Sequence, residues 1–320
     1  MKAVVFTGVG EPLAYQEMPA PQPADHHIIV TLKAAALNHR DNWMTKGKYP
    51  GLRPNIIVGS DGAGTVGDRA VILNPSLNWG DSERFQAADY QILGMPSHGT
   101  LAEQIAVQPQ QLVDKPAHLS FEQAAALPLA GLTAYRALFS RCQLQPGERV
   151  LISGVGGGVA LFACQFAIAA GAEVFVTSSS AAKIEAAIAL GAAGGANYRE
   201  EGWHKKLGKE TGGFDVVIDG AGGDGFAQLV ALCRPGGRIG IYGGTRGMLS
   251  NISPQQLFFR QLSIHGSTMG SDKEFAEMVA FVNQHQLVPV VDAVFPLADV
   301  NEAIARMDRG EQFGKIVLRI

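Results

Sequence analysis

The alternation of short apolar runs with helical patterns after residue 148 restricts the possible folds of this chain more than any other feature. The apolar runs are Val150–Ser153, Val174–Thr177, Phe214–Asp219, Gly237–Tyr242 and Leu262–Gly266, and helical patterns lie between most of them. Neighbouring parallel strands need crossover connections, and the helices of those connections cover both faces of the sheet. The second half of the chain is therefore predicted to contain a doubly wound parallel sheet.

The first 115 residues have a different pattern, made of short strands and turns. Ile28–Ala35 and Leu101–Val107 are the clearest extended runs, and prolines punctuate the region from Pro12 to Pro54. This pattern is typical of a mostly-β barrel.

The pattern changes near residue 118, where Ser120 and Gln123 form a capping box before a helix. The terminal run Gly314–Leu318 is expected to be a strand that returns to the first domain. We therefore predict an α/β chain with a discontinuous mostly-β domain, residues 1–117 and 268–320, and an inserted parallel-sheet domain, residues 118–267.

A glycine-rich loop, SGVGGGVA at residues 153–160, joins the first apolar run of the sheet to a helix. Bare backbone before a helix N-terminus lets a pyrophosphate approach unpaired N–H groups. The strict G-x-G-x-x-G pattern is absent, because Val155, Gly157 and Ala160 occupy its three positions. The loop therefore favours a dinucleotide site, and a purely structural turn stays open as an alternative.

The end of the next strand distinguishes the two nicotinamide cofactors, because NAD-binding proteins place an acid there to hold the ribose hydroxyls. Here the segment is Thr177-Ser178-Ser179-Ser180, without an acid, and Lys183 follows one turn into the helix. Hydroxyls and a lysine suit the 2′-phosphate of NADPH. The serines can also simply cap the helix, and both roles can coexist.

Composition excludes several other classes of protein. The 320 residues carry a formal net charge of −3, which gives no electrostatic reason to bind nucleic acid or an anionic membrane. The apolar stretches are shorter than the ~20 residues of a transmembrane helix, and the segment from Met1 to Gly8 is too short for a signal peptide. We expect a cytoplasmic protein that acts on small molecules and has reduced, buried cysteines at Cys142, Cys164 and Cys233.

Six segments spread over nearly the whole chain carry a family resemblance. They are AAALNHRDNWMTKGKYP (34–50), IVGSDGAG (57–64), FEQAAALPLAGLTAYRAL (121–138), SGVGGGVALFACQFAIAAGA (153–172), GANYREE (195–201) and LCRPGGRIGIYGG (232–244). With these motifs the chain resembles the medium-chain dehydrogenase/reductase superfamily, in particular its zinc-independent, quinone oxidoreductase-like branch. The resemblance implies a GroES-like catalytic domain, a Rossmann domain that binds NADP(H), and a homodimer.

The resemblance also implies which residues contact the cofactor. The positions that match the family's contacts are Thr133 beside the nicotinamide, Gly157, Gly158 and Val159 at the pyrophosphate, Ser178, Lys183 and Tyr198 at the 2′-phosphate, and Gly243 near the ribose. Ser267 and the segment Phe313-Gly314-Lys315 are further candidates. Ser179 joins them as a neighbouring hydroxyl.

Zinc-dependent members of the superfamily bind catalytic zinc at three positions, which match Asn38, Ser60 and Ala130 here. Zinc needs three or four protein ligands, and residues 74–81, which replace the family's structural zinc lobe, contain no cysteine. We expect no metal. His39 and Asp41 remain potential ligands, although the Asn-His-Arg-Asp turn is interpreted as structural. A second departure is the short segment Thr65–Arg69, which lacks a hairpin usual in the family.

We predict an enzyme that transfers hydride from NADPH to a quinone or an α,β-unsaturated carbonyl. The family places the side chains at Asn38 and Tyr49 over the nicotinamide, with Arg40 and Trp43 as candidate wall residues. The Asn38 amide is expected to donate to the substrate oxygen, and Tyr49 or a bound water to return the proton. Asn38 can instead stabilise its turn, and Tyr49 can be a packed barrel residue. Two other functions remain open: an NADPH-binding protein with a structural or regulatory role and little turnover, and a zinc-type alcohol dehydrogenase.

Overall fold

A six-stranded parallel sheet forms the centre of residues 133–268, one of the two units into which the computed structural model divides. The structure describes residues 1–22 and 26–320. The strand order is β13-β12-β11-β14-β15-β16, and every neighbouring pair is parallel. In chain order this is 3-2-1-4-5-6, the order of dinucleotide-binding Rossmann sheets. The strands are β11 (Arg149–Ile152), β12 (Glu173–Ser178), β13 (Gly194–Asn197), β14 (Phe214–Asp219), β15 (Cys233–Ile241) and β16 (Ser263–Gly266).

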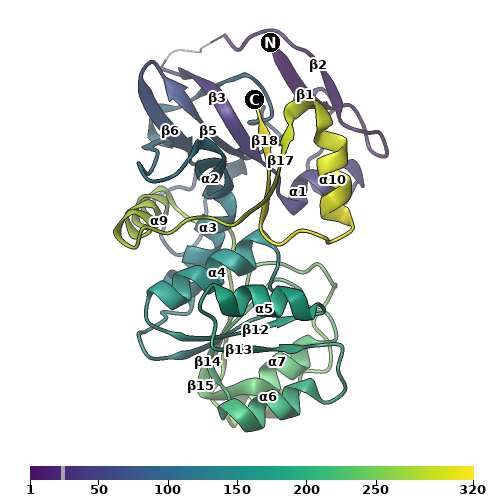
Figure 1. Cartoon of the computed structure of the whole chain (residues 1–320), viewed down its shortest axis with the longest axis vertical. Coiled ribbons are helices and arrows are strands. Elements are labelled where there is room, and N and C mark those ends of the chain that lie inside the picture. The colour runs from purple at the N-terminus through teal and green to yellow at the C-terminus, as the bar shows by residue number, and fades with distance from the viewer. Residues whose placement is uncertain (23–25) are drawn as a thin grey trace. The chain divides into compact units, whose positions relative to one another are not determined.

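Helices cover both faces of this sheet, as the sequence pattern predicts. Figure 1 shows α4 and α5 on one side of the strands and α6 and α7 on the other. The central strand β11 is buried on both faces, with Val150, Leu151 and Ile152 all inaccessible to solvent, which explains its continuous apolar sequence. The helices of this unit are η2 (Arg136–Arg141, π-helical), α4 (Gly158–Ala169), α5 (Ala181–Ala189), α6 (Trp203–Thr211), α7 (Phe226–Leu232) and α8 (Pro254–Phe258).

One strand of the sheet, β13, was not predicted. Its sequence is Gly194-Gly195-Ala196-Asn197, residue types that are depleted in strands. It forms because its backbone pairs with β12, from Phe175 opposite Gly194 to Ser178 opposite Asn197. A side chain at Gly195 would clash, since its Cβ would lie 2.8 Å from the carbonyl oxygen of Val176.

The other unit, residues 1–132 and 269–320, is mostly β-structure. A seven-stranded sheet runs in the order β10-β6-β5-β3-β18-β17, with β9 also paired to β3, and a three-stranded sheet runs β2-β1-β4. Its strands are β1 (Lys2–Phe6), β2 (Ala14–Glu17), β3 (Ile28–Ala36), β4 (Ile56–Ile57), β5 (Asp61–Val66), β6 (Arg69–Leu73), β7 (Ser76–Leu77), β8 (Gln91–Ile92), β9 (Gln104–Val107), β10 (Leu112–Asp114), β17 (Val291–Pro296) and β18 (Lys315–Arg319).

The last strand returns to the first unit, as predicted. β18 pairs with β3 through Val317, Leu318 and Arg319, opposite Ala36, Ala35 and Ala34. The short segment noted in the sequence is a direct two-residue connection, because Val66 of β5 pairs with Arg69 of β6 around Gly67 and Asp68.

Helices of the first unit include one whose start the sequence predicts. In the capping box of α2 the Gln123 backbone N–H donates to Ser120 Oγ (3.2 Å), and the Ser120 N–H donates to Gln123 Oε1 (2.9 Å). The helices that belong wholly to this unit are α1 (His39–Thr45), η1 (Pro109–Gln111), α2 (Phe121–Ala126), α9 (Asp272–Gln284), η3 (Leu297–Asp299) and α10 (Val300–Asp308).

The boundary between the units falls inside α3 (Pro128–Tyr135), between Leu132 and Thr133. The sequence places the domain boundary earlier, between residues 117 and 118, where the β pattern ends. The domain boundary between residues 117 and 118 stays a prediction.

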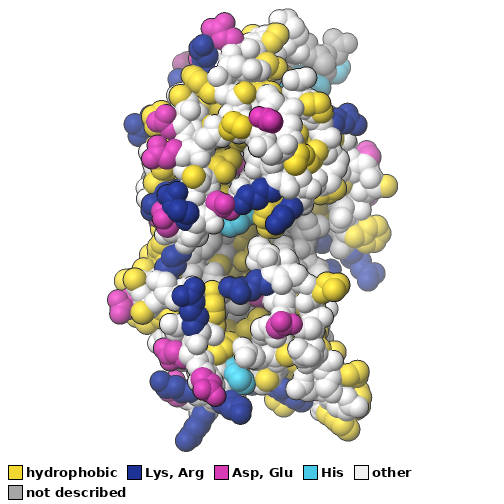
Figure 2. Space-filling model, turned by 90° about the vertical axis from the view of Figure 1, so that its right-hand side faces the viewer, with side chains coloured by type: hydrophobic (Ala, Val, Ile, Leu, Met, Phe, Trp, Pro, Cys, Tyr) yellow, Lys and Arg dark blue, Asp and Glu magenta, His cyan; other side chains and the backbone are white. Residues whose placement is uncertain are grey.

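The mixed charges on the surface and the buried, free cysteines agree with what the composition predicts. Figure 2 shows basic and acidic side chains interspersed with apolar ones on the face that it presents. None of the helices within residues 1–22 and 26–320 is both long and apolar enough to cross a bilayer. The three cysteines are free and buried, as expected, and burial raises the pKa of each thiol to about 12.

Candidate cofactor and active site

The glycine-rich loop makes a tight connection between β11 and α4. The Val155 N–H donates to the Thr177 carbonyl oxygen (2.7 Å), and the Gly154 N–H donates to Thr177 Oγ1 (3.1 Å). Gly154 and Gly156 adopt positive φ angles of 64° and 134°, which side-chain-bearing residues rarely reach. The glycines therefore do serve a structural turn, and the remaining question is whether they also leave room for a ligand.

Room is present at the residue that caps α4. A Cβ built on Gly157 would meet no atom within 4 Å, although its backbone (φ −81°, ψ 159°) would tolerate a side chain. The first backbone N–H groups of the 12-residue helix α4, which begins with Gly158 and Val159, have no partner within the helix itself. A helix N-terminus next to a residue without a side chain suits a phosphate group.

Lys183 lies against this loop. A Cβ on Gly156 would lie 2.9 Å from Lys183 Cδ and 3.3 Å from its Nζ, so the lysine side chain reaches back from α5 to the glycine loop. A cation therefore stands beside the open space at Gly157.

The serines at the end of β12 and just after it differ in their contacts. Ser180 caps α5, because its Oγ accepts from the Lys183 N–H (3.4 Å), and this confirms the capping alternative for that residue. The Ser178 hydroxyl accepts from the Ser180 N–H (3.3 Å) and is buried, whereas Ser179 is half-buried. No carboxylate stands between Thr177 and Lys183.

Tyr198 follows the neighbouring strand β13 and meets a residue that sequence reasoning missed. Its N–H donates to the Ser178 carbonyl oxygen (3.1 Å), and Cζ of Arg246 lies 5.8 Å from the centre of its ring. Arg246 is exposed, in the loop after β15. Nothing in the local sequence around Arg246 indicates this neighbour, because β13 and β15 are distant in the chain.

The remaining candidates end other strands of the same sheet. Gly243 follows β15, and a Cβ there would lie 2.8 Å from the Gly220 carbonyl oxygen, so only glycine fits. Ser267 follows β16 and has a buried Oγ that makes no hydrogen bond to any residue that the structure describes. Thr133 belongs to α3, where it is buried. The predicted cofactor residues of this unit, Thr133 excepted, thus follow the carboxyl ends of strands, or begin the next helix, at one edge of the sheet, where α/β sheets bind ligands. The candidate segment Phe313-Gly314-Lys315 lies instead in the other unit, where β18 begins.

Asn38, the first predicted catalytic residue, lies in the other unit just before α1. Its side chain is buried between two charges: Nδ2 donates to Asp61 Oδ2 (2.9 Å), and Oδ1 accepts from Lys315 Nζ (2.7 Å). Lys315 and Asp61 form an ion pair of 2.8 Å, with 3% and 0% of their side chains exposed. Lys315 Nζ also donates to the Leu37 carbonyl oxygen (2.8 Å), and the Leu129 N–H donates to Asp61 Oδ1 (2.7 Å). The ammonium group of Lys315 therefore has its partners within this unit. The sequence indicates Lys315 as a candidate cofactor contact and does not predict these partners.

Tyr49, the second predicted catalytic residue, packs against a buried arginine. Cζ of Arg40 lies 4.7 Å from the centre of the Tyr49 ring. The Arg40 guanidinium donates to Ser60 Oγ and to the carbonyl oxygens of Leu93 and Met95. Tyr49 also packs against the hydrophobic core of its unit. Arg40 thus covers one face of the Tyr49 ring. The catalytic role of Tyr49 stays a prediction.

Two of the three positions that match zinc ligands hold hydrogen-bonding side chains, and the third is the buried, apolar Ala130. Asn38 is engaged by Asp61 and Lys315, and Ser60 accepts from Arg40 and donates to the Leu93 carbonyl oxygen (2.8 Å). Within the described ranges, no three or more His, Cys, Asp or Glu side chains are grouped so as to bind a metal ion. The donor set therefore does not fit catalytic zinc.

Asp41 has the structural role expected of the Asn-His-Arg-Asp turn. Its Oδ2 accepts from the Asn38 backbone N–H (2.8 Å), which closes the first turn of α1. The side chain is fully buried, and burial raises the pKa of its carboxyl group.

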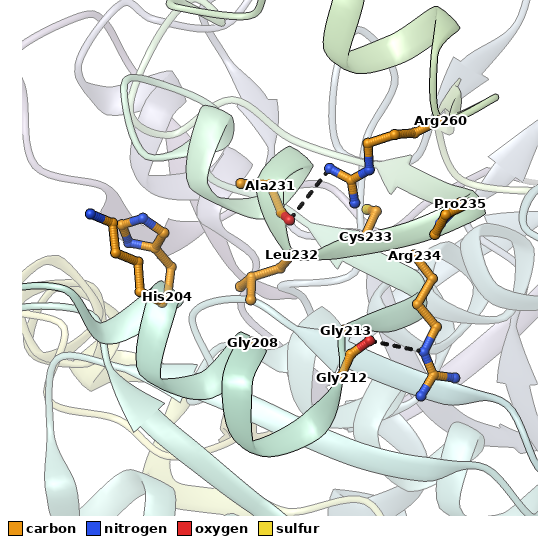
Figure 3. Close-up of a pocket in the computed structure, with 11 residues that line it drawn as sticks. His204, Gly208, Gly212, Gly213, Ala231, Leu232, Cys233, Arg234, Pro235 and Arg260 are labelled. Atoms are coloured by element: carbon orange, nitrogen blue, oxygen red, sulfur yellow. Dashed lines mark hydrogen bonds between the residues drawn. The ribbon is translucent and has the colours of Figure 1, made fainter.

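A separate pocket of about 500 Å³ lies at the opposite, amino-terminal edge of the parallel sheet. Figure 3 shows its lining, in which Arg234 donates to the Gly212 carbonyl oxygen and Arg260 to that of Ala231. The lining residues are His204, Lys205, Gly208, Gly212, Gly213, Ala231, Leu232, Cys233, Arg234, Pro235 and Arg260. None of the predicted cofactor residues is among them.

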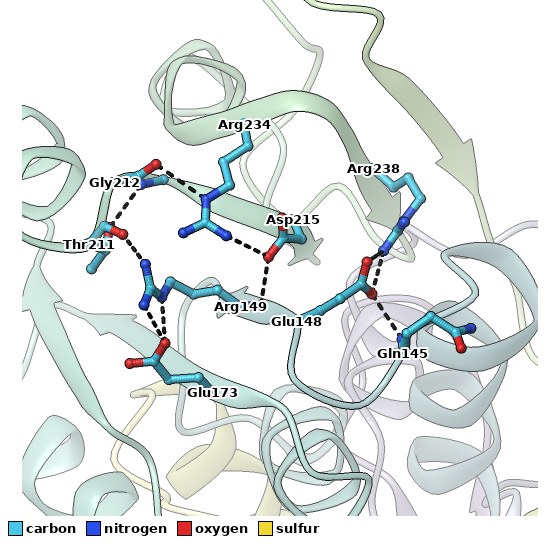
Figure 4. A network of polar contacts seen from close by, with 10 residues as sticks. Gln145, Glu148, Arg149, Glu173, Thr211, Gly212, Asp215, Arg234 and Arg238 are labelled. Carbon is cyan, nitrogen blue, oxygen red and sulfur yellow. Dashed lines mark hydrogen bonds and ion pairs between the residues drawn. The ribbon is translucent and has the colours of Figure 1, made fainter.

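The same edge of the sheet carries a network of ion pairs (Figure 4). Arg149 at the start of β11 pairs with Glu173 at the start of β12 (Nε to Oε2, 2.6 Å), and its backbone N–H donates to Asp215 Oδ2 (2.8 Å). Arg234 also donates to Asp215 (2.9 Å). These contacts connect the amino ends of neighbouring strands.

Comparison with known proteins agrees with this architecture. Residues 24–117 match the family "Alcohol dehydrogenase GroES-like domain", and residues 158–284 match "Zinc-binding dehydrogenase". The chain is 35% identical to the zinc-type alcohol dehydrogenase-like protein YogA of Leptosphaeria maculans, over 97% of this chain and 95% of that protein. It is 29% identical to a crotonyl-CoA reductase of Streptomyces avermitilis, over 94% of this chain and 80% of that one.

The chain is also similar to proteins whose structures have been solved. A structure described as an NAD-dependent alcohol dehydrogenase superposes with a TM-score of 0.94 at 37% identity, over the full length of both chains. The quinone oxidoreductase of Thermus thermophilus, also described in its complex with NADPH, superposes with a TM-score of 0.85 at 30% identity, again over both full chains. With its GroES-like and Rossmann parts, the chain belongs to the medium-chain dehydrogenase/reductase superfamily and is an oxidoreductase.

Proposed function

We propose that this oxidoreductase uses NADPH to reduce a quinone or an α,β-unsaturated carbonyl compound without catalytic zinc. The observation that carries the proposal is the environment of Asn38. At a position where zinc-type relatives are expected to hold a metal ligand, this chain has an amide fixed by Asp61 and Lys315. An amide N–H can stabilise an oxyanion, but it polarises a simple aldehyde more weakly than a metal ion does.

NADPH supplies a hydride when it is bound, and the protein has to orient the acceptor and stabilise the charge that develops on its oxygen. We propose that the second N–H of the Asn38 amide donates to that oxygen, and that Tyr49 or a bound water supplies the proton. Electron-poor acceptors suit such a site because they need no stronger electrophilic assistance.

The preference for NADPH rests on Lys183 and on the absence of an acid after β12. Lys183 lies in the first turn of α5, directly after the serines that end β12, and Ser178, Ser179 and Tyr198 are the proposed neighbours of the 2′-phosphate. Gly157, Gly158 and Val159 are proposed to bind the pyrophosphate, with Thr133, Gly243 and Ser267 as further contacts. The NADPH complex of the Thermus thermophilus relative supports this preference.

The names of two relatives described above favour a second candidate, an alcohol dehydrogenase, and one of those names specifies NAD as the cofactor. Initial rates separate the candidates. Chelator-treated protein is assayed with NADPH and NADH in parallel against a quinone, a 2-alkenal and a saturated aldehyde. Turnover restricted to NADPH with the quinone or the alkenal supports the proposal.

Two other results would reject it. Activity on the saturated aldehyde that chelation abolishes and zinc restores would establish the alcohol dehydrogenase. Tight NADPH binding without turnover of any acceptor would favour a binding protein with a structural or regulatory role.

We also propose a homodimer that forms along β16. This strand lies at the end of the parallel sheet and pairs only with β15 among the described residues. Ile264 in β16 and Phe259 just before it are exposed by 36% and 78%. An unprotected strand edge with apolar side chains is a surface that a second copy can cover. Light scattering should give twice the chain mass of 33.8 kDa, and Ile264→Lys should yield monomers. The cytoplasmic location stays a prediction.

A further inference from the structure

The orientation of the Asn38 amide is determined by two buried charges. Its oxygen faces the Lys315 ammonium group at 2.7 Å, and its nitrogen faces the Asp61 carboxylate at 2.9 Å. The reversed amide would place N–H groups against an ammonium and an oxygen against a carboxylate. Both contacts would be repulsive, so only one orientation of this amide is compatible with its neighbours.

The donors and acceptors of the three side chains can be counted completely. Lys315 has three N–H donors, and they go to the Leu37 carbonyl oxygen, Asn38 Oδ1 and Asp61 Oδ2. Asp61 accepts one further bond, from the Leu129 N–H. Asn38 Nδ2 has two N–H donors, and Asp61 takes one of them. The second N–H of Asn38 makes no hydrogen bond to any residue in the described part of the chain, so the network leaves one donor available.

Lys315 also compensates the charge of Asp61. An isolated carboxylate beside Asn38 would repel an oxyanion, and a buried carboxylate interacts strongly because little water screens it. The ion pair is almost completely buried, so the cation offsets the carboxylate at the place where an oxyanion would bind.

We propose that Lys315 is a positioning residue of the reductase: together with Asp61 it fixes the Asn38 amide so that its single available N–H is preorganised for the developing oxyanion. This inference rests on the proposed function. It assigns to Lys315 a role in catalysis that acts through Asn38, without contact between Lys315 and the substrate.

The test removes both charges at once, because Lys315→Met alone leaves Asp61 buried and unpaired and can prevent folding. The double variant Lys315→Met/Asp61→Asn is neutral and no longer fixes the amide. We expect its kcat to fall about 10- to 100-fold, less than the roughly 100- to 1000-fold lost when an oxyanion donor is removed outright, because the donor remains but is no longer fixed. Its Kd for NADPH and its melting temperature should be unchanged. The matched control is Arg69→Met/Asp114→Asn, which removes an exposed ion pair of the same unit (2.6 Å) and should leave kcat unchanged.

A cycle with Asn38→Ala distinguishes positioning from a general structural effect. If Lys315 and Asp61 act through Asn38, the double variant should cost less than about twofold in kcat in the Asn38→Ala background. Additive losses would overturn the inference. If Asn38→Ala lowers kcat but the double variant does not, the inference fails and the proposed role of Asn38 stands. If Asn38→Ala has no effect, the proposed role of Asn38 fails.

A spectroscopic readout tests the inference without any turnover. The two side-chain N–H protons of Asn38 should give widely separated NMR signals in the wild-type protein, because one donates to a carboxylate and the other is available. The signals are assigned by their loss in Asn38→Ala. They should move together in Lys315→Met/Asp61→Asn, and unchanged signals there would overturn the inference even if no acceptor is ever reduced.

Discussion

Substitution of Gly157 by alanine separates the stability of the glycine loop from its proposed contact with the cofactor. The Gly157 backbone has a negative φ, and a Cβ there meets no atom within 4 Å, so alanine fits the folded protein. Replacing a glycine at such a position reduces the entropy of the unfolded chain and stabilises by about 0.4–1 kcal/mol. Gly157 is the N-cap of α4, where alanine is a poorer cap than glycine, and this cost offsets the gain. The variant is therefore expected to fold about as well as the wild type.

The same methyl group should impair cofactor binding, because it fills the space proposed for the pyrophosphate. Losing one hydrogen bond between a backbone N–H and a charged oxygen costs about 1.5–3 kcal/mol. At about 1.36 kcal/mol for each factor of ten, we expect the Kd for NADPH to rise about 10- to 150-fold.

Fluorescence titration with NADPH measures the Kd, and thermal unfolding measures the stability. Gly8→Ala is the control, since a Cβ there makes only an ordinary contact with Glu11 Cγ at 3.8 Å. Its Kd for NADPH should stay unchanged, and its stability should change only by the entropic gain of about 0.4–1 kcal/mol. An unaltered Kd in a well-folded Gly157→Ala protein would refute the assignment of the pyrophosphate to this loop.

Four further predictions follow from single sites. Lys183→Met should raise the KM for NADPH about tenfold or more, because a charge-assisted contact is lost, and should leave the KM for NADH nearly unchanged; equal effects on both would contradict the 2′-phosphate assignment. Gly64→Ala should destabilise the protein by about 3 kcal/mol or more through overpacking, because its Cβ would lie 2.2 Å from the Thr31 carbonyl oxygen; wild-type resistance to denaturant would show that the strands can move apart. The three buried thiols, whose pKa burial raises to about 12, should react with Ellman's reagent at about pH 8 only after unfolding, and fast labelling of native protein would contradict their burial. Burial raises the pKa of the Asp41 carboxyl group, so the stability contributed by its protonated form is complete below its unfolded pKa and is lost as the pH rises through the folded pKa. Asp41→Asn should therefore melt at a higher temperature than the wild type at about pH 7.5, and this difference should shrink toward about pH 5. An unchanged or lower melting temperature of the variant at neutral pH would oppose this account.

The sequence by itself determined the features that depend on neighbouring residues. The apolar runs at β11, β12 and β14 predict buried strands, and the helical patterns between them predict parallel pairing. The glycines after Ile152 predict a tight turn before α4. The capping box at Ser120 is equally local, since its two partners are three residues apart. Such signals need no knowledge of distant residues.

Tertiary structure decided what depends on distant residues. β13 forms from glycine, alanine and asparagine only because β12 offers a pairing edge, and Arg246 meets Tyr198 only because the loops after β13 and β15 lie at one edge of the sheet. The network around Asn38 joins residues 38, 61 and 315, and no sequence pattern connects positions that are 277 and 254 residues apart. The sequence predicts Lys315 to lie in a strand and offers it as a candidate cofactor contact, and neither prediction indicates Asn38 as its neighbour. Pairing of β18 with β3 brings it beside Asn38, because hydrogen-bonded strands lie about 5 Å apart whatever their separation along the chain.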